Sequence, residues 1–418
     1  MTRKCQEKSS WKGPLNNVKV LDFTRVLSGP YATMMLADQG AEVIKVETPG
    51  KGDDTRNFPP FQGDMSHYYM SLNRNKKSIT LNLATEEGKM IARDLAAKSD
   101  VVIENFRPGV MERLGLDYAT LAEHNPGLVY CSISGFGADG PLRDQPSFDI
   151  VAQALSGVMS VNGEPGARPT KMGLPIGDMA GGIYGSIAIL SALYERKETG
   201  KGRLIDISML DSLLGMLGYL AQIYLVTGES PKPQGTRHPN LVPYGAFKTS
   251  DGYIIIACLT EGFWHNLARA IGDEELIEDS RFADYASRLT YRDELNELVE
   301  RHTRTCTTAE WTERLQRYDV PHSPILSIGE ALEHENTRAR NMINSVYHPV
   351  MGELRLVGNP IHYMGMPRPS LEPPPLLGEN TEEILKDILH LDVEQIAELR
   401  DRGVFNPLGT LKVAERTC

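Results

Sequence analysis

Residues 18–47 read VKVLDFTRVLSGPYATMMLADQGAEVIKVE, and this stretch contains a complete strand–helix–strand unit. The runs VKVLDF and AEVIKVE predict two strands, and SGPYATMMLADQG between them predicts a helix. The unit spans about thirty residues, as expected where a right-handed crossover joins two parallel strands. The stretch therefore predicts a parallel sheet with a helix packed against it.

The same alternation of strand and helix continues after this unit. A helix capped by Thr85 is expected to run to Lys98, because Glu86 and Glu87 in its first turn face the positive end of the helix dipole. A second, apolar helix is expected from Asp178 to the glycine-rich stop TGKG. Further strands are predicted at SITLNL, DVVIEN, LVYCSISGFG and LIDISML. Several parallel strands flanked by helices predict an α/β protein with a doubly wound sheet.

The composition of the chain changes near residue 228. The segment GESPKPQGTRHPN is rich in Pro, Gly and polar residues and marks a domain boundary. FKTSDGYIIIACL after it predicts a hairpin, and amphipathic helices are expected over residues 260–317. From about residue 325 the sequence is loop-rich, before a final helix at TEEILKDIL. We therefore predict a large domain over 1–228, a smaller α+β domain over 229–325 and a C-terminal segment over 326–418.

Composition and charge exclude several classes of function. The 418 residues are 41% hydrophobic and 24% charged, as in an ordinary globular protein, and two domains fit that length. The formal net charge of −11 argues against a nucleic-acid partner. An anionic substrate must therefore be met by local cations rather than by the overall field. No signal peptide or membrane span is expected, and the most apolar segment, LLGMLGYLAQIYLV at 213–226, is predicted to be a buried helix.

The cysteines and histidines give no sign of a metal site. The five cysteines are scattered, odd in number and form no C-x-x-C pair, so neither zinc nor a disulfide framework is expected. His67 and His238 lie in polar loops without a partner at ligand spacing, and Cys131 is expected to be a core residue rather than a nucleophile. The free cysteines fit a reducing compartment. We expect a cytoplasmic protein, with a mitochondrial matrix location left open.

Several polar segments are candidates for binding phosphate or carboxylate. Arg56 lies in the loop GKGDDTR, where it is either a solvated turn residue or an anion ligand. The run NRNKKS concentrates three cations, Arg74, Lys76 and Lys77, just before a strand. The segment ENFRPGVMERLG follows the carboxyl end of a strand, where open α/β sheets bind ligands, and supplies Asn105, Phe106, Arg107 and Arg113. GFGADG at 135–140 has the spacing of a dinucleotide loop, but no helix is predicted after it, so nicotinamide or flavin binding is not expected.

Asp178 lies at the start of an apolar helix in GLPIGDMAGG. Aspartate is a favoured N-cap, so a structural cap is one interpretation. The neighbouring Gly177, Gly181 and Gly182 cost helix stability, which favours a second interpretation, close approach of a bulky ligand to the backbone. In that interpretation amides at the helix start could hold the oxyanion formed when the carboxylate attacks a carbonyl.

Together these segments resemble a known family. The residues that carry the resemblance are LDFTRVLSGPYATMMLADQGAEVIKVE, GDDTR, LNRNKKSI, ENFRPG, SISGFGADGP, GLPIGDMAGG and PPPLLGENT, in this order over about residues 15–405. The chain is similar to the class III CoA-transferases, the formyl-CoA transferase and carnitine CoA-transferase family. NRNKKSI, VPYGAFKT and PPPLLG are most similar to the succinyl-CoA:glutarate type.

The resemblance implies a covalent mechanism without a metal or a permanently bound cofactor, in which a coenzyme A thioester is a substrate. Asp178 would attack the acyl-CoA to give a mixed anhydride, and the released thiolate would return to form an aspartyl-CoA thioester. The acceptor acid would then attack this thioester and leave as its own CoA ester. Succinyl-CoA is the expected donor and a short dicarboxylate the expected acceptor.

The resemblance also implies a CoA site. By register, that site would comprise Val26, Leu27, Ser28, Leu81, Asn82, Leu83, Ala84, Asn105, Phe106, Arg107, Arg113, Phe148 and Asp149, together with Arg56. Two positions depart from formyl-CoA transferase, which has a glutamine at the position of Leu27 and an arginine at that of Thr48. The glycine-rich flap of that enzyme has no evident counterpart. Arg56, Arg107 and Arg168 are each candidates to hold a distal carboxylate of the acceptor.

Alternatives remain within the same superfamily. α-Methylacyl-CoA racemases have a histidine at the position of Phe148, and phenylalanine cannot move a proton, so a racemase is the weaker reading. A CoA-binding subunit of a heteromeric transferase is a further alternative. The family architecture implies a Rossmann-like large domain built from both chain ends, a small middle domain, and two ring-like chains interlocked as a homodimer.

Overall fold

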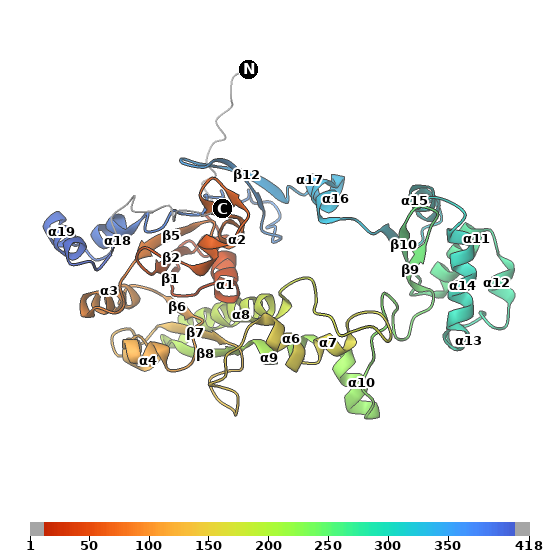
Figure 1. The fold of residues 1–418 in the computed structure, drawn as a ribbon, viewed down its shortest axis with the longest axis horizontal. Helices are drawn as coiled ribbons and strands as arrows, with labels where there is room; N and C mark the ends of the chain where they lie inside the picture. Colours follow the sequence, from red (N-terminus) through yellow and green to blue (C-terminus); the bar gives the residue numbers. More distant parts are fainter. Residues whose placement is uncertain (1–11, 406–418) are drawn as a thin grey trace, which may run out of the picture. The chain divides into compact units, whose positions relative to one another are not determined.

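The computed structural model describes residues 12–405, and the chain divides into two units, each with its own core (Figure 1). Unit 1 comprises the chain up to Val158, Met172–Gln222 and the chain from Arg338 onward, and unit 2 comprises Met159–Lys171 and Ile223–Thr337. Unit 2 is therefore wider than the 229–325 that we predicted. It includes 159–171 because this segment pairs with the linker, where Gly235 N donates to the carbonyl of Gly163 at 2.9 Å. Cys5 and Cys418 lie outside the described residues.

Unit 1 is built on a six-stranded sheet in which all neighbouring strands are parallel. In spatial order the strands are β5 (Lys76–Thr80), β2 (Glu42–Glu47), β1 (Lys19–Asp22), β6 (Val101–Glu104), β7 (Val129–Ser134) and β8 (Arg203–Ser208). The predicted α/β fold with a central parallel sheet is confirmed. The chain leaves β1 toward β2 and β5 and then crosses to β6, so the strand order reverses between β1 and β6. Ligands of open α/β sheets bind at such a switch point.

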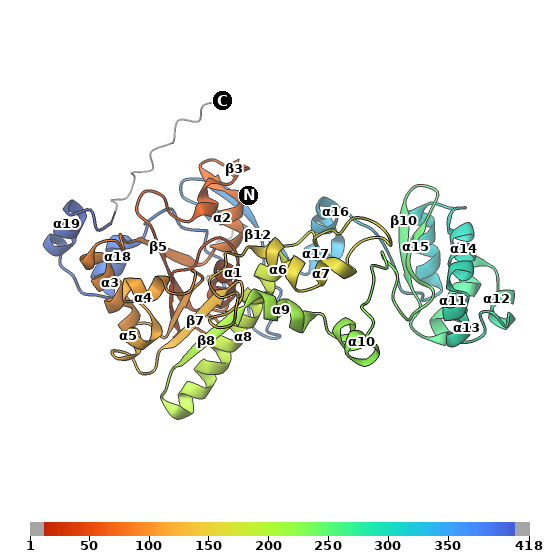
Figure 2. The same ribbon diagram turned by 60° about the horizontal axis from the view of Figure 1, so that its bottom comes forward.

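Alternate residues of the strands contact two separate cores. Val20 and Val43 belong to one core, and their neighbours Leu21 and Ile44 belong to the other, since side chains alternate across a strand. The first core includes α1 (Ser28–Ala37) and α8 (Ile176–Thr199); the second includes α3 (Glu86–Ala97), α18 (Thr381–Asp387) and α19 (Val393–Asp401). Figure 2 shows α3 and α18 side by side against the sheet. The sheet is therefore covered on both faces.

The two helices predicted from caps and stops are present. The Thr85 side chain accepts the Gly88 N–H at the start of α3. α8 ends at Gly200, whose φ of 67° is left-handed and therefore suits glycine. By length and composition α8 is long and apolar enough to cross a membrane, and half of its apolar window is buried inside the protein. The bent pair formed by residues 209–216 and 219–227 passes the same test if it is taken as one span. Cys131 is fully buried in β7, as expected of a core residue.

The prediction of one buried helix over 213–226 is wrong. The chain forms α9 (Met209–Met216) and α10 (Tyr219–Thr227), which are bent by 77° relative to each other. The helix breaks because Gly218 has a φ of 54°, outside the right-handed helical region. None of the residues of α10 is buried, and Leu225 and Val226 are 72% and 75% exposed. Helix α10 therefore has an exposed apolar surface, although the sequence predicted that this segment is part of the core.

The C-terminal part of unit 1 is more regular than the sequence suggested. A two-stranded hairpin of β12 (Ile343–His348) and β13 (Gly352–Val357) lies within the segment predicted to be loop-rich. After it an extended stretch runs along the edge strand β5, where Asn380 N donates to Ser78 O at 2.9 Å and Thr80 N donates to Thr381 Oγ1 at 3.1 Å. Residues from the C-terminal part of the described chain therefore cover the edge of the sheet that the N-terminal part forms.

Unit 2 contains a three-stranded antiparallel sheet packed against helices around Trp264 and Trp311. The hairpin predicted around Asp251-Gly252 is present as β9 and β10. The elements of this part are β9 (Tyr244–Lys248), β10 (Tyr253–Ala257), α11 (Glu261–Ile271), α12 (Glu275–Glu278), α13 (Tyr285–Thr290), α14 (Arg292–Thr303), α15 (Thr308–Arg317), β11 (His322–Pro324), α16 (Ile328–Glu333) and α17 (Glu335–Ala339). The remaining elements are η1 (Asp54–Asn57), β3 (Phe61–Gln62), β4 (Met65–Ser66), α2 (His67–Leu72), α4 (Val110–Leu114), α5 (Tyr118–Ala122), α6 (Asp149–Leu155) and α7 (Val158–Val161).

Candidate active site

A pocket of about 580 Å³ lies in unit 1 at the carboxyl ends of the parallel strands. Residues that follow β1, β2, β5, β6, β7 and β8 all line it, as the switch-point rule predicts. Asp178 lines the same pocket from the first turn of α8. The pocket therefore places the Asp178 carboxylate opposite strand ends that carry polar, acidic and cationic side chains.

Asp178 does not cap its own helix. Pro175 occupies the N-cap position without a side-chain hydrogen bond, so the interpretation of Asp178 as a structural N-cap is wrong. The cap is supplied instead by Asp149, whose Oδ1 accepts Gly177 N at 2.7 Å and Asp178 N at 3.3 Å. These two amides are consequently occupied, which contradicts the idea that they are ready to hold an oxyanion. The Asp178 carboxylate is left to face the pocket.

The environment of Asp178 favours its neutral form. Burial is the main cause and the nearby negative charge of Asp149 adds to it, so the pKa of Asp178 is raised from 3.8 to about 7. Asp149 is held in place by Gln153, whose Nε2 donates to Asp149 Oδ2 at 2.6 Å. A carboxyl whose pKa lies near neutrality and that faces a pocket is a candidate functional group.

The glycines around Asp178 serve packing rather than ligand approach. A Cβ at Gly182 would lie 2.6 Å from the carbonyl oxygen of Ser28, and one at Gly181 would lie 2.9 Å from the Ser28 hydroxyl. A Cβ at Gly177 would lie 3.0 Å from the Asp149 carboxylate that caps the helix. These positions let α8 lie close to α1 and to Asp149. The prediction that the glycines admit a bulky ligand is therefore wrong.

The turn between β1 and α1 lines the pocket through Val26, Leu27 and Ser28, three of the predicted site residues. Val26 has a φ of 66°, which is rare for a β-branched residue. The Ser28 hydroxyl is buried and has no hydrogen-bond partner among the described residues. A buried hydroxyl without a partner is unusual and is available to a ligand.

The β6 end contributes Asn105, Phe106 and Arg107 to the pocket, as predicted, whereas Arg113 does not line it. The Asn105 side chain is occupied: its Oδ1 accepts Arg25 N at 2.8 Å and its Nδ2 donates to Arg25 O at 2.8 Å. The Arg25 guanidinium lies 5.0 Å from the centre of the Phe106 ring, within the range of a cation–π contact. Asn105 therefore holds the neighbouring turn.

Of the four predicted residues after β5, Leu81 and Leu83 line the pocket and Asn82 and Ala84 do not. The alternation follows from extended backbone, in which successive side chains point to opposite sides. The Asn82 Oδ1 accepts Ala84 N at 3.1 Å, and the Asn82 N donates to Val404 O at 2.8 Å. These two residues thus belong to the local turn and the C-terminal packing.

Arg56 is not among the residues that line the pocket, contrary to the prediction that it binds an anionic ligand there. Its guanidinium pairs with Glu47 Oε1 at 2.6 Å, lies 3.7 Å from the centre of the Tyr69 ring and donates to the Pro375 carbonyl at 3.3 Å. The pair is almost entirely buried, with the Glu47 side chain 1% exposed. Arg56 is occupied by structural contacts.

The basic cluster NRNKKS, which was expected just before a strand, runs into β5 and is not a phosphate site. Arg74 pairs with the buried Asp38 at 2.5 Å, and Lys76 lies 3.3 Å from Asp22 with both side chains fully buried. Lys77 pairs with Glu42 at 3.0 Å. Each cation of NRNKKS therefore has an acidic partner. The third candidate for an acceptor ligand, Arg168, lies in unit 2 and is exposed.

Sequence reasoning missed three cationic residues of the pocket, Arg25, Lys45 and Arg143. Arg25 lies three residues after the end of β1, so the rule that selected Asn105 after β6 also selects it. Lys45 lies within an apolar strand, and no local pattern distinguishes its role. Phe148 and Asp149 were expected beside the acyl group; Phe148 lines the pocket and is 74% exposed, and Asp149 contacts Asp178. Among the described residues, no group of three or more His, Cys, Asp or Glu side chains is placed to hold a metal ion.

Known proteins resemble this chain over most of its length. The family model described as CoA-transferase family III matches residues 15–381. The chain belongs to CoA-transferase family III. A succinyl-CoA:glutarate CoA-transferase of Homo sapiens is 39% identical over 394 residues, 94% of this chain and 90% of the human protein. An acetyl-CoA:oxalate CoA-transferase of Acetobacter aceti is 39% identical over 378 residues, 90% of this chain and 96% of that protein.

A solved structure has the same fold. A CAIB/BAIF family protein from Brucella suis superimposes with a TM-score of 0.81 at 37% identity, covering 90% of this chain and 100% of that one. This member of CoA-transferase family III is thus an enzyme with CoA-transferase activity. The two positions that depart from formyl-CoA transferase, Leu27 and Thr48, both line its pocket.

Proposed function

We propose that this family III CoA-transferase moves CoA from succinyl-CoA to a short dicarboxylate, with Asp178 as the covalent nucleophile. The observation that carries the proposal is the carboxylate of Asp178, which has no capping role and faces the pocket at the strand ends. The other carboxylates that line the pocket, those of Glu47, Asp53 and Asp54, are paired with cations. The relatives named for succinyl-CoA with glutarate and with mesaconate support a succinyl donor and a dicarboxylate acceptor. The pocket cations Arg25, Arg107 and Arg143 offer charge to phosphates or to a distal carboxylate.

The proposed reaction proceeds through four acyl transfers. An Asp178 oxygen attacks the thioester carbonyl, the C–S bond breaks, and the CoA thiolate leaves a mixed anhydride on Asp178. The thiolate then attacks the Asp178 carbonyl carbon and displaces the donor acid as its carboxylate. The acceptor carboxylate attacks the resulting aspartyl-CoA thioester and releases the thiolate again. The thiolate finally attacks the acceptor carbonyl, which gives the new CoA ester and returns Asp178 to a carboxylate.

Ser28 is the donor that we propose for the carbonyl oxygen under attack. Its buried hydroxyl has no protein partner within the described chain, and it lies beside the first turns of α8, where a Cβ at Gly181 would meet it at 2.9 Å. A hydrogen bond to an oxygen that gains negative charge stabilises the transition state more than the ground state. Asp149 would keep the start of α8, and with it Asp178, in register.

The proposed function is tested by a matrix of donors and acceptors. Purified enzyme is incubated with succinyl-CoA or acetyl-CoA and with glutarate, mesaconate or oxalate, and new CoA esters are measured by chromatography. Transfer is expected from succinyl-CoA, and Asp178→Ala should abolish it. Asp94→Ala, which removes an exposed carboxylate on α3 outside the pocket lining, is the matched control and should transfer normally.

The covalent intermediate has its own test. Turnover mixtures quenched with hydroxylamine or borohydride should carry a modification at Asp178 in peptide mass spectra. Product formation with Asp178 always unmodified would contradict the proposal. Solvent deuterium entering the α-position of an acyl-CoA without an acceptor acid would instead indicate a racemase, and CoA binding without any transfer would indicate a subunit that needs a partner.

We also propose that the enzyme is a homodimer in a reducing compartment such as the cytoplasm. Exposed apolar side chains support the presence of a partner surface. On α8, Ile187 and Tyr194 are 53% and 71% exposed, and on α10, Leu225 and Val226 are 72% and 75% exposed. Large exposed apolar patches are typical of protein–protein interfaces. Light scattering after size exclusion should give the mass of two chains.

A further inference from the structure

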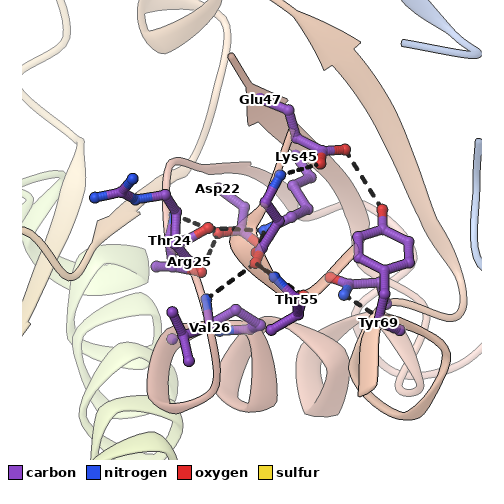
Figure 3. Close-up of polar contacts among 12 residues, drawn as sticks. Asp22, Thr24, Arg25, Val26, Lys45, Glu47, Thr55 and Tyr69 are labelled. Carbon is purple, nitrogen blue, oxygen red and sulfur yellow. Dashed lines mark hydrogen bonds and ion pairs between the residues drawn. The ribbon is translucent and has the colours of Figure 1, made fainter. Parts of the chain in front are cut away.

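The turn formed by Thr24, Arg25 and Val26 is held by side chains from the β2 side and the β6 side of the sheet. Figure 3 shows the β2 side, with Lys45 beside the turn. On the β6 side, the Asn105 Oδ1 accepts the N–H of Arg25, and the Asn105 Nδ2 donates to the C=O of Arg25. On the β2 side, Lys45 Nζ donates to Thr24 O at 2.7 Å, and Asp53 Oδ1 accepts Val26 N at 3.3 Å. Four consecutive polar groups of the backbone are therefore bound by side chains rather than by a ligand or by regular secondary structure.

The turn needs such support because its backbone is strained. Val26 has a φ of 66°, in a region that is unfavourable for a β-branched residue. Strained conformations persist where surrounding contacts over-determine them, and they cluster at binding sites. Val26 and its neighbours Arg25 and Leu27 line the pocket, so relaxation of this turn would change the wall that faces the ligand.

The support on the β2 side is a buried ion pair. Lys45 Nζ lies 2.9 Å from Asp53 Oδ2, and both side chains are fully buried. Asp53 Oδ1 also accepts the backbone N–H of Thr55 at 3.0 Å and its hydroxyl at 2.8 Å, and Asp53 N donates to Glu47 Oε2 at 2.9 Å. Asp53 is thus fixed from several directions, and its bond to Val26 has a defined position. A buried ion pair adds little net stability in general, which makes a positioning role the better explanation for this one.

We propose that Asp53 and Lys45 are positioning residues that hold the Thr24–Val26 turn in the strained conformation that binds the CoA moiety. The inference deepens the proposed function, since it takes CoA as the ligand of the pocket. Neither residue is required to touch the reacting carbonyl. Their loss should therefore weaken CoA binding and raise KM for the acyl-CoA, with a smaller effect on kcat.

The test measures the Kd for CoA by titration calorimetry in four variants. Asp53→Ala should raise Kd about tenfold, which corresponds to about 1.4 kcal/mol, because Val26 is then free to relax. Adding Val26→Gly to this variant should bring Kd back to within about threefold of wild type, because glycine adopts positive φ without strain. Adding Val26→Ala should not, because alanine keeps the Cβ that causes the strain.

The matched control is Asp38→Ala. It breaks the equally buried Arg74–Asp38 pair, whose residues do not line the pocket. Both Asp53→Ala and Asp38→Ala leave a buried cation without its partner and should lower the melting temperature. Only Asp53→Ala should change Kd. If Asp53→Ala does not fold, Asn105→Ala replaces it, because this change releases the other side of the turn without leaving a charge unpaired.

Two results would overturn the inference: a wild-type Kd in Asp53→Ala, or in the folded Asn105→Ala substitute, and a failure of Val26→Gly to restore binding where Kd has risen. Its failure is distinguishable from that of the proposed function. Wild-type enzyme that binds CoA with the expected variant pattern but transfers it to no acid contradicts the transferase proposal alone. Wild-type enzyme that does not bind CoA contradicts both.

Discussion

Asp178 should determine the lower pH limit of activity. Only the ionised carboxylate attacks a thioester, and burial with the nearby Asp149 charge raises its pKa to about 7. The value of kcat/KM should therefore fall about tenfold per pH unit below pH 7, rather than below pH 4 as for an exposed aspartate. Asp149→Asn should move this limb to lower pH, because it removes the like charge while its Oδ1 can still accept Gly177 N. A pH–rate profile from 5 to 9 checks both; an unchanged limb in the variant would exclude the electrostatic role.

The same raised pKa should make Asp178 destabilising at alkaline pH. A carboxyl with a folded-state pKa above its unfolded value opposes folding once it ionises, so the penalty is complete above about pH 7 and absent below about pH 4. Asp178→Asn should therefore melt at a higher temperature than wild type at pH 8, by a few degrees, about the shift that 1 kcal/mol produces. The difference should disappear at pH 4. Thermal melts at the two pH values measure it, and a variant less stable at pH 8 would contradict the assignment.

Ser28→Ala should separate activity from stability. The hydroxyl has no hydrogen-bond partner among the described residues, so its removal breaks no protein contact and relieves a buried polar group. If it stabilises the attacked carbonyl oxygen, kcat should fall by about 10²-fold, as for other oxyanion donors. Steady-state kinetics and thermal melts on the same preparation are the measurements. A loss of stability with unchanged kcat would show a purely structural hydroxyl.

Site residues that were selected by their place after a strand were predicted better than those that were selected because they carry a positive charge. Phe106 and Arg107 were selected because they follow a strand end, and the parallel sheet brings strand ends together wherever the strands are correct. Val26 was implied by the family resemblance, and it too lines the pocket. Arg56 was selected as a cation in a flexible loop and Lys76 as part of a basic cluster beside a strand. Their carboxylate partners, Glu47 and Asp22, lie on strands β2 and β1. A single sequence does not show whether a cation faces a ligand or a buried acid.

The packing of α8 on α1 should be sensitive to a single methyl group. Gly182→Ala would place a Cβ 2.6 Å from the carbonyl oxygen of Ser28, which is backbone and cannot rotate away. We expect a loss of about 1–3 kcal/mol, as for other overpacked sites, in chemical denaturation. Gly329→Ala is the control: it lies in α16 with nothing within 4 Å of the added Cβ, so it should be neutral or slightly stabilising. Equal effects of the two changes would exclude the packing argument.

The helices and strands that were predicted well are those whose boundaries are marked by their own residues, such as a capping side chain or a terminal glycine. Thr85 caps α3, Gly200 ends α8, and the apolar runs of the parallel strands are buried on both faces. The bend at Gly218 was missed because apolar residues continue on both sides of it, and periodicity alone does not distinguish one buried helix from two helices with an exposed half. The β12–β13 hairpin was missed because no two-residue Asn-Gly or Asp-Gly turn marks it.

The exposed apolar side chains of α10 should be part of the proposed dimer interface. Leu225→Asp combined with Val226→Asp places two charges where a partner chain would cover apolar surface, at residues that are 72% and 75% exposed in one chain. The variant should elute and scatter as a monomer, while wild type does so as a dimer. Met90→Asp on α3, which is 49% exposed, is the control and should leave the mass unchanged. A dimeric double variant would place the interface elsewhere.

The way the extended stretch after the β12–β13 hairpin covers β5 has a consequence for synthesis. Strand β5 is at the edge of the sheet, and its outer hydrogen-bonding groups are satisfied by Asn380 and Thr381, from the far end of the chain. On the ribosome, β5 emerges some three hundred residues before these partners. Until Asn380 and Thr381 have been made, a nascent chain carries an open strand edge of the kind that templates aggregation. Premature stop codons between residues 209 and 376 should therefore yield insoluble protein even though all six strands are already made.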